Sequence, residues 1–161
     1  MNVIKYQKSL KLILFLSIFA LVSAYFIQYV LGHQPCNLCL FERIPYLSSI
    51  IIILSCFYFK KFEKISLILL SLIFFFATML SFYHFGIEQG FIKESLVCNL
   101  SVGDNFINPE ELLKSLKEKP ISCKDVTFRL FGLSLATINI FISLIVSVIT
   151  LKLFLDYEKN K

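Results

Sequence analysis

Four long apolar stretches, separated by short clusters of charged residues, dominate the pattern of hydrophobic and polar positions along the chain. In the first of them, no charged residue occurs between Lys11 and Glu42. A helix needs about 20 apolar residues to cross the roughly 30 Å hydrocarbon layer of a membrane. The pattern therefore predicts four membrane-spanning helices. They cover about 12–31, 40–59, 65–85 and 132–151.

The composition agrees with this pattern and defines the fold class. Of the 161 residues, 57% are hydrophobic and 18 are Phe, which is well above the usage in soluble domains. We predict a single all-α membrane domain over residues 1–161, a four-transmembrane-helix bundle in the lipid bilayer. Polar residues within the stretches, such as Ser49, Ser71, Thr78 and Asn139, are expected to bond between helices. The net charge of +5 comes mainly from the charged clusters, and we expect no nucleic-acid partner.

The second stretch is the shortest, because only residues 44–59 are free of charge. We place its start near Leu40, with Glu42 and Arg43 at the membrane interface. Pro45 fits there, since the first turn of a helix lacks intrahelical partners for its amides. A helix that enters only half of the membrane is the alternative.

The first stretch also has features of a cleavable secretory signal, namely a basic start and the sequence VSA at 22–24. Its apolar residues continue to Leu31 without a polar segment. We therefore expect the helix to be retained, with cleavage after Ala24 as the alternative.

Basic residues near the ends of spans tend to face the cytoplasm. They are concentrated before the first stretch, in KKFEK at 60–64, and after the fourth stretch. We predict that both termini and the 60–64 loop are cytoplasmic, and that the loops 32–39 and 86–131 face outward. Four of the five cysteines then lie outside the cytoplasm, where disulfides form in bacteria. We expect the protein in the bacterial inner membrane.

The outer cysteines are Cys36, Cys39, Cys98 and Cys123, whereas Cys56 lies within the second stretch as a small apolar residue. A tetrahedral zinc site needs a second close pair or suitably spaced histidines beside a C-x-x-C. Cys98 and Cys123 are far apart and the chain has only two histidines, so we expect no metal. Two disulfides, one tight and one closing a long loop, fit better.

The tight pair and the long-range pair differ in how much a disulfide would stabilise the chain. A disulfide between Cys98 and Cys123 would stabilise its loop by roughly 3.5 kcal/mol in the chain-entropy model. The ring of a C-x-x-C disulfide is too small to constrain the chain, which favours exchange chemistry at Cys36 and Cys39. If the second helix begins near Cys39, the positive end of its dipole stabilises the Cys39 thiolate.

Arg43 lies four residues after Cys39 and therefore on the same face of that helix. It either supports the same thiolate or acts as an interfacial anchor that reaches to the headgroups. The spacing alone favours neither role.

The sequence NPEELLKSLKEKP at 108–120 predicts a short amphipathic helix in the long outer loop. Asn108 suits the cap of this helix, and Pro109 suits its first position. The helix either lies on the membrane surface or is an ordinary solvated loop helix.

Three segments resemble the DsbB family of inner-membrane disulfide-forming oxidoreductases. QPCNLCLFERIPY at 34–46 resembles its P-C-x-L-C-x-x-[QE]-R motif, and YHFGIE at 83–88 resembles its Y-H-x-G-x-E segment. CKDVTFRLFGLSLATIN at 123–139 is similar to the region of its fourth cysteine. The chain departs from the family at Phe128, where Trp is common, and at ESLVC, where Gly-Pro is common. The resemblance extends over essentially the whole chain.

The resemblance implies an electron relay through the pairs Cys36 with Cys39 and Cys98 with Cys123. A periplasmic thioredoxin-fold dithiol oxidase, DsbA-like, would attack Cys98, and the released Cys123 would attack Cys36. Cys39 would then be the thiolate that faces a membrane quinone, either ubiquinone or menaquinone.

The same resemblance places Arg43 and His84 at the quinone. For His84, an interfacial histidine with no ligand role is the alternative. Two other functions stay open, namely a non-catalytic membrane scaffold with two structural disulfides and a vitamin K epoxide reductase-like enzyme. In that enzyme type the C-x-x-C pair lies toward the C-terminal end of the bundle, whereas here it follows the first span.

Overall fold

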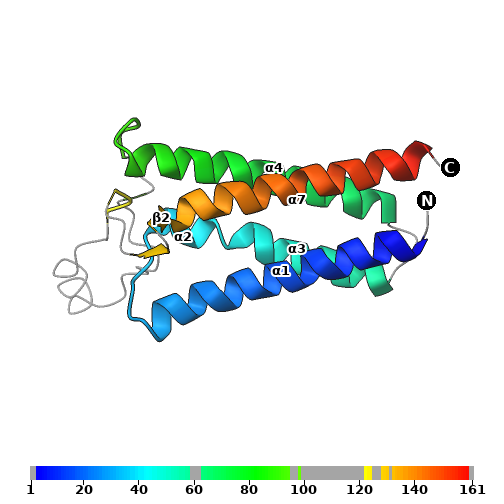
Figure 1. Cartoon of the computed structure of the whole chain (residues 1–161), viewed down its shortest axis with the longest axis horizontal. Coiled ribbons are helices and arrows are strands. Elements are labelled where there is room, and N and C mark those ends of the chain that lie inside the picture. Colours follow the sequence, from blue (N-terminus) through cyan, green and yellow to red (C-terminus); the bar gives the residue numbers. More distant parts are fainter. Residues whose placement is uncertain are drawn as a thin grey trace, which may run out of the picture.

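The structure is a computed structural model that describes residues 3–58, 63–94, 98, 122–124, 128–130 and 132–159. Its long helices lie side by side as a bundle (Figure 1). Both ends of the chain lie at one end of the bundle, and the short strands lie at the opposite end. The helix predicted at 108–120 falls outside the described residues.

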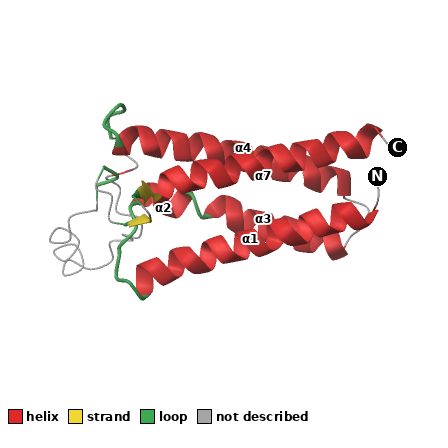
Figure 2. Cartoon of the chain, in the orientation of Figure 1, coloured by secondary structure: helices red, strands yellow, loops and turns green. Residues whose placement is uncertain are grey.

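Five helices and two short strands make up the described part of the chain (Figure 2). They are α1 (Val3–Tyr29), α2 (Asn37–Phe41), α3 (Ile44–Tyr58), α4 (Glu63–Glu88), β1 (Arg129–Leu130), β2 (Leu133–Ser134) and α7 (Leu135–Lys159). Four helical segments are long and apolar enough to cross a membrane, with α2 and α3 together forming the second. The predicted fold class, helical with four spans, is confirmed.

Two helices extend further than predicted at the end of the bundle where the termini lie. α1 begins at Val3 instead of about 12, and α7 continues to Lys159 instead of about 151. Hydropathy shows where the lipid ends, whereas the backbone hydrogen bonds of a helix continue into water. The predicted bounds therefore describe the apolar part of each helix and not its full length.

The second span begins earlier than predicted and is interrupted. α2 starts at Asn37 instead of about 40. Glu42 and Arg43 then form a turn before α3 begins. Pro45 explains the break, because it has no N–H to bond the carbonyl of Phe41 four residues earlier.

A two-stranded antiparallel hairpin precedes α7, and the all-α prediction did not include it. Arg129 of β1 lies opposite Ser134 of β2. Gly132, between the strands, has a φ of 82°, which glycine adopts without steric cost. The Ser134 hydroxyl accepts a hydrogen bond from the backbone N–H of Thr137 at 3.2 Å and so caps the start of α7.

Small polar side chains join the helices inside the bundle. The hydroxyl oxygens of Ser17 in α1 and Ser49 in α3 are 2.8 Å apart. Ser71 of α4 and Ser147 of α7 each donate to the other's carbonyl, at 3.5 and 3.2 Å. The predicted inter-helix role of Ser49 and Ser71 is confirmed. Thr78 instead bonds a carbonyl one turn earlier in its own helix.

Large apolar side chains fill the bundle, and many others face outward. Leu67, Leu70 and Phe74 of α4 belong to the buried core. Phe15 and Phe76, by contrast, are 68% and 67% exposed. Such an exposed apolar surface on helices is suited to contact with lipid acyl chains.

Candidate redox site

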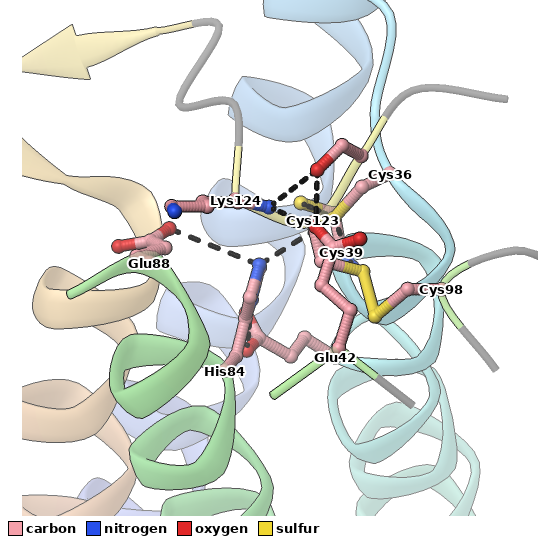
Figure 3. Close-up of a disulfide and its surroundings, with 10 residues drawn as sticks. Cys36, Cys39, Glu42, His84, Glu88, Cys98, Cys123 and Lys124 are labelled. Carbon is pink, nitrogen blue, oxygen red and sulfur yellow. Dashed lines mark hydrogen bonds and ion pairs between the residues drawn. A yellow bond between two sulfur atoms is a disulfide. The ribbon is translucent and has the colours of Figure 1, made fainter. Parts of the chain in front are cut away.

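Four cysteines meet at the end of the bundle that lies opposite the termini (Figure 3). Cys36, Cys98 and Cys123 are buried in one cluster with Ile87 of α4, and Cys39 packs against this cluster. The two cysteine pairs expected from the sequence are therefore neighbours in space, although they belong to different segments of the chain.

Cys98 and Cys123 form a disulfide with their Cα atoms 5.7 Å apart. Both residues are buried. Glu94 holds the segment that carries Cys123, because its carboxylate accepts hydrogen bonds from the Ser122 hydroxyl and from the backbone N–H of Lys124. The long-range pairing implied by the family resemblance is thus present in the structure.

Cys36 is the N-cap of α2, and its sulfur accepts a hydrogen bond from the backbone N–H of Cys39 at 3.4 Å. The two side chains are not joined by a disulfide, and their sulfur atoms are 2.9 Å apart. Because α2 starts earlier than predicted, the positive end of its dipole faces the sulfur of Cys36. The prediction that the helix start favours the Cys39 thiolate is therefore wrong.

The surroundings of Cys36 stabilise its thiolate. Hydrogen bonding by the Cys39 thiol lowers the pKa of Cys36 to about 4, with smaller contributions from a hydrogen bond and the charge of His84 and with burial opposing the shift. The Nε2 atom of His84 lies 3.5 Å from the Cys36 sulfur. The thiolate is the nucleophilic form of cysteine, so Cys36 is well suited to thiol–disulfide exchange.

His84 belongs to α4, and its buried side chain lies next to two carboxylates, as Figure 3 shows. Its Nδ1 atom lies 3.0 Å from Oε1 of Glu42, and its Nε2 atom lies 3.8 Å from Oε1 of Glu88. Glu42 is only 7% exposed, whereas the sequence placed it at the membrane interface. The turn between α2 and α3 is the reason, because it allows the Glu42 side chain to reach α4.

Asn139 of α7 holds the other carboxylate oxygen of Glu42. Its Nδ2 atom donates to Oε2 of Glu42 at 3.2 Å and to the Ser81 hydroxyl at 2.7 Å. Its Oδ1 atom accepts a hydrogen bond from the Tyr46 hydroxyl. The predicted inter-helix role of Asn139 is confirmed, and the network also fixes the carboxylate that contacts His84.

An apolar cavity of about 270 Å³ lies beside the tight cysteine pair. Its walls are mainly apolar residues of α1 and α7, and its polar lining includes Cys39, Glu42 and Arg43. Among the described residues that line it, neither Cys36 nor His84 occurs. Cys39 is therefore the member of the pair that borders the cavity, and His84 acts on the other member.

Arg43 is held by α1. Its guanidinium donates to the side-chain carbonyl of Gln28 at 2.7 Å and lies 5.0 Å from the centre of the Tyr25 ring. It lines the cavity next to Cys39 and also a second cavity of about 360 Å³. This arrangement presents a positive charge to both cavities.

Glu42 and Glu88 are parts of the site that were not predicted from the sequence. Glu88 follows His84 by one helical turn, so the spacing itself was a usable signal. The contact between Glu42 and His84 joins two spans that are remote in sequence, and no local pattern reveals it.

The fold and the site together define a multi-pass membrane protein with a thiol–disulfide centre at one end of a helical bundle. The chain belongs to the DsbB family, because the family model described as Disulfide bond formation protein DsbB matches residues 7–153. The uncharacterized protein RP370 of Rickettsia prowazekii (strain Madrid E) is 31% identical over 156 residues, covering 95% of this chain and 90% of that protein. No solved structure matches the chain. The prediction of the family is confirmed, and the chain is a disulfide-forming membrane protein of the oxidoreductase type.

Proposed function

We propose that the protein takes electrons from a periplasmic DsbA-like dithiol oxidase and passes them through its two cysteine pairs to a membrane quinone. One observation carries this proposal. Cys36 shares a buried cluster with the Cys98–Cys123 disulfide, while Cys39 borders the apolar cavity. The tight pair thus lies between the second disulfide and a space suited to a lipid-soluble acceptor.

The first half of the reaction is thiol–disulfide exchange. A thiolate of the partner attacks Cys98, forms a mixed disulfide and releases Cys123 as a thiolate. Cys123 then attacks Cys36, the bond between Cys36 and Cys39 breaks, and Cys39 leaves as a thiolate. Because Cys98 and Cys123 are buried in the described structure, the cluster has to open for the partner to reach them.

The second thiol of the partner then completes the partner's disulfide and releases Cys98. Cys98 re-forms its bond with Cys123, and Cys36 is released. Two electrons have moved from the partner's dithiol to the tight pair.

The lining of the cavity fits a quinone. Its apolar walls suit a ring with an isoprenoid tail, and the Arg43 guanidinium supplies charge-assisted donors for a carbonyl oxygen. When bound, ubiquinone or menaquinone provides an acceptor for two electrons and two protons as Cys36 and Cys39 regain their disulfide. His84 holds the Cys36 sulfur by a hydrogen bond, and Glu42 orients His84.

The proposed location is the bacterial inner membrane with both termini in the cytoplasm. The basic clusters at the ends of the spans support this orientation. It puts the cysteine cluster, which lies opposite the termini, on the periplasmic side. Disulfides form and persist on that side, whereas they are rare in the reducing cytoplasm.

The test is a turnover assay with purified protein, a reduced DsbA-like partner and quinone, followed by the loss of quinone absorbance. We expect catalytic quinone reduction that stops in Cys36→Ser, Cys39→Ser, Cys98→Ser and Cys123→Ser. Cys56→Ser is the control, because Cys56 is buried in the core of α3 away from the cluster. A scaffold with structural disulfides would give no quinone reduction even with the native protein.

A further inference from the structure

Three metal-ligating atoms converge at the tight cysteine pair. The sulfur atoms of Cys36 and Cys39 and a ring nitrogen of His84 all lie within 4.8 Å of one another. We propose that, when both thiols are reduced, these side chains and Glu88 bind Zn²⁺ or a similarly thiophilic divalent cation. This site does not depend on the proposed quinone or partner, because it needs only the reduced pair and α4.

The distances suit a tetrahedral ion. With Zn–S bonds of about 2.3 Å and Zn–N bonds of about 2.0–2.1 Å, a sulfur and a nitrogen on one tetrahedral ion are about 3.5 Å apart. The Cys36 sulfur and the His84 Nε2 atom are 3.5 Å apart. The two sulfur atoms, now 2.9 Å apart, would have to separate to about 3.8 Å at the same bond lengths. Cys39 borders the cavity, so its side chain has room to move.

Glu88 is the proposed fourth ligand, and its carboxylate, which is not among the three groups within 4.8 Å of one another, would have to move toward the sulfur atoms. Its side chain is 6% exposed, and its Oε1 atom lies 3.8 Å from Nε2 of His84. Its Oε2 atom is buried and makes no hydrogen bond of good geometry to a described residue, with the Ser134 hydroxyl near the carboxylate. A buried carboxylate oxygen without a partner is costly, and coordination of a cation beside His84 would satisfy it.

Glu42 orients His84 in the way that metal sites require. Histidine ligands almost always donate their second ring N–H to a carboxylate or carbonyl, which fixes the tautomer and the ring orientation. Nδ1 of His84 lies 3.0 Å from Oε1 of Glu42, which leaves Nε2 for the cation. Asn139 in turn holds Oε2 of Glu42, so this support is itself fixed.

Binding is linked to the redox state of the pair. Ligands bind a metal in their deprotonated forms, so the cation displaces the protons that remain on the two sulfur atoms and on Nε2 of His84, and no electron moves. When Cys36 and Cys39 form a disulfide, both thiolate ligands disappear and the site is lost. A bound cation therefore holds the pair in its reduced form, as two thiolates, and it would reversibly inhibit any electron transfer that needs this pair.

The proposed site differs from the expectation of no metal that was drawn from the sequence. That expectation required the additional ligands to stand at short spacing from the C-x-x-C. His84 and Glu88 come from α4, and the fold brings them to the pair from a distant part of the chain.

The test is a titration with Co²⁺, which reports tetrahedral thiolate coordination by its absorption. A Cys98→Ser/Cys123→Ser background leaves Cys36 and Cys39 as the outer thiols, and the purified protein is reduced and freed of reductant. We expect one Co²⁺ per chain, with sulfur-to-cobalt charge-transfer absorption and intense visible bands, and loss of both on adding Zn²⁺. Oxidation of the pair with diamide should abolish binding.

Variants separate the proposed ligands from their neighbours. In the same background, His84→Ala and Glu88→Gln should weaken Zn²⁺ binding in competition with a chromophoric chelator. Glu42→Gln should weaken it by roughly 10–100-fold, as for other groups that orient a ligand. His33→Ala, at the chain's other histidine, and Cys56→Ser are controls that should bind normally.

Two results would overturn the proposal. One is a cobalt spectrum and zinc affinity that are the same in His84→Ala and Glu88→Gln as in the parent, which would mean that the two thiols bind the metal alone. The other is binding that persists after oxidation of the pair. The assay contains neither partner nor quinone, so failure of the proposed thiol:quinone reaction leaves its outcome unaffected.

Discussion

Arg43 shows how one residue combines the two roles that its position in the sequence left open. Its guanidinium is anchored by Gln28 and lies over Tyr25, both on α1, and it still lines the cavity next to Cys39. The anchor is therefore another helix and not the lipid headgroups. A fixed cation at a cavity is better prepared to bind a ligand than a mobile one, because less side-chain entropy is lost on binding.

We expect Arg43→Ala to raise the KM for quinone while exchange with the reduced partner continues. A hydrogen bond to a charged group is worth about 1.5–3 kcal/mol, which corresponds to roughly tenfold or more in affinity. Steady-state kinetics with varied quinone measure this effect, and stopped-flow oxidation of the partner measures the other half-reaction. Unchanged quinone kinetics would restrict Arg43 to its structural contacts with α1.

At the scale of the elements, the network around Asn139 ties three helical segments together. Asn139 on α7 contacts Ser81 on α4, Tyr46 on α3 and Glu42 in the turn before α3. All four residues are buried. Removing the amide leaves several buried polar groups without partners, at a cost of about 1–3 kcal/mol for each.

We therefore expect Asn139→Leu to lower the thermal unfolding midpoint of the protein in detergent by several degrees. Thr78→Ala is a suitable control, because the Thr78 hydroxyl bonds only within its own helix among the contacts described. A small effect in both variants would show that the network contributes little to stability.

The elements also show where sequence reasoning succeeds and where it stops. The four helices followed from runs of apolar residues, because the bilayer imposes a minimum length that few other structures need. The start of α2 was misplaced, because hydropathy does not register an N-cap formed by Cys36. Pro45 was recognised as compatible with a helix start, but the turn that it produces buried Glu42, and burial of that kind depends on a partner from α4.

At the scale of the whole molecule, the termini and the cysteine cluster lie at opposite ends of the bundle. The proposed orientation therefore has a simple test. Green fluorescent protein fused after the C-terminal residue should fluoresce, because it folds in the cytoplasm, whereas alkaline phosphatase fused after Gly90 should be active, because it needs the periplasm. The opposite pattern would invert the topology and separate the cysteines from an oxidising compartment.

The disulfide between Cys98 and Cys123 connects the molecule to its proposed partner. We expect Cys123→Ser to accumulate a mixed disulfide with a partner variant that keeps only its attacking cysteine, supplied as a mixed disulfide with a small thiol. The free Cys98 displaces the small thiol, and neither Cys123 nor a second partner thiol is present to break the new bond. Non-reducing electrophoresis and mass spectrometry of the adduct measure this. The same experiment with Cys98→Ser should give no such adduct, and an adduct formed equally well there would assign the attack to Cys123.

The short helix α2 has a kinetic consequence for the whole relay. Cys36 faces the buried cluster and Cys39 faces the cavity, yet the two residues are separated by only about 4.5 Å along a helix axis. Passing electrons across this distance requires only bond exchange and small side-chain rotations within the pair, whereas opening the cluster requires rearrangement of packed elements, which is a slower class of motion. In the proposed reaction, we therefore expect turnover to be limited by the opening of the cluster to the partner and by the movement of quinone into and out of the cavity. Rearrangement of the C-x-x-C pair is not expected to limit it.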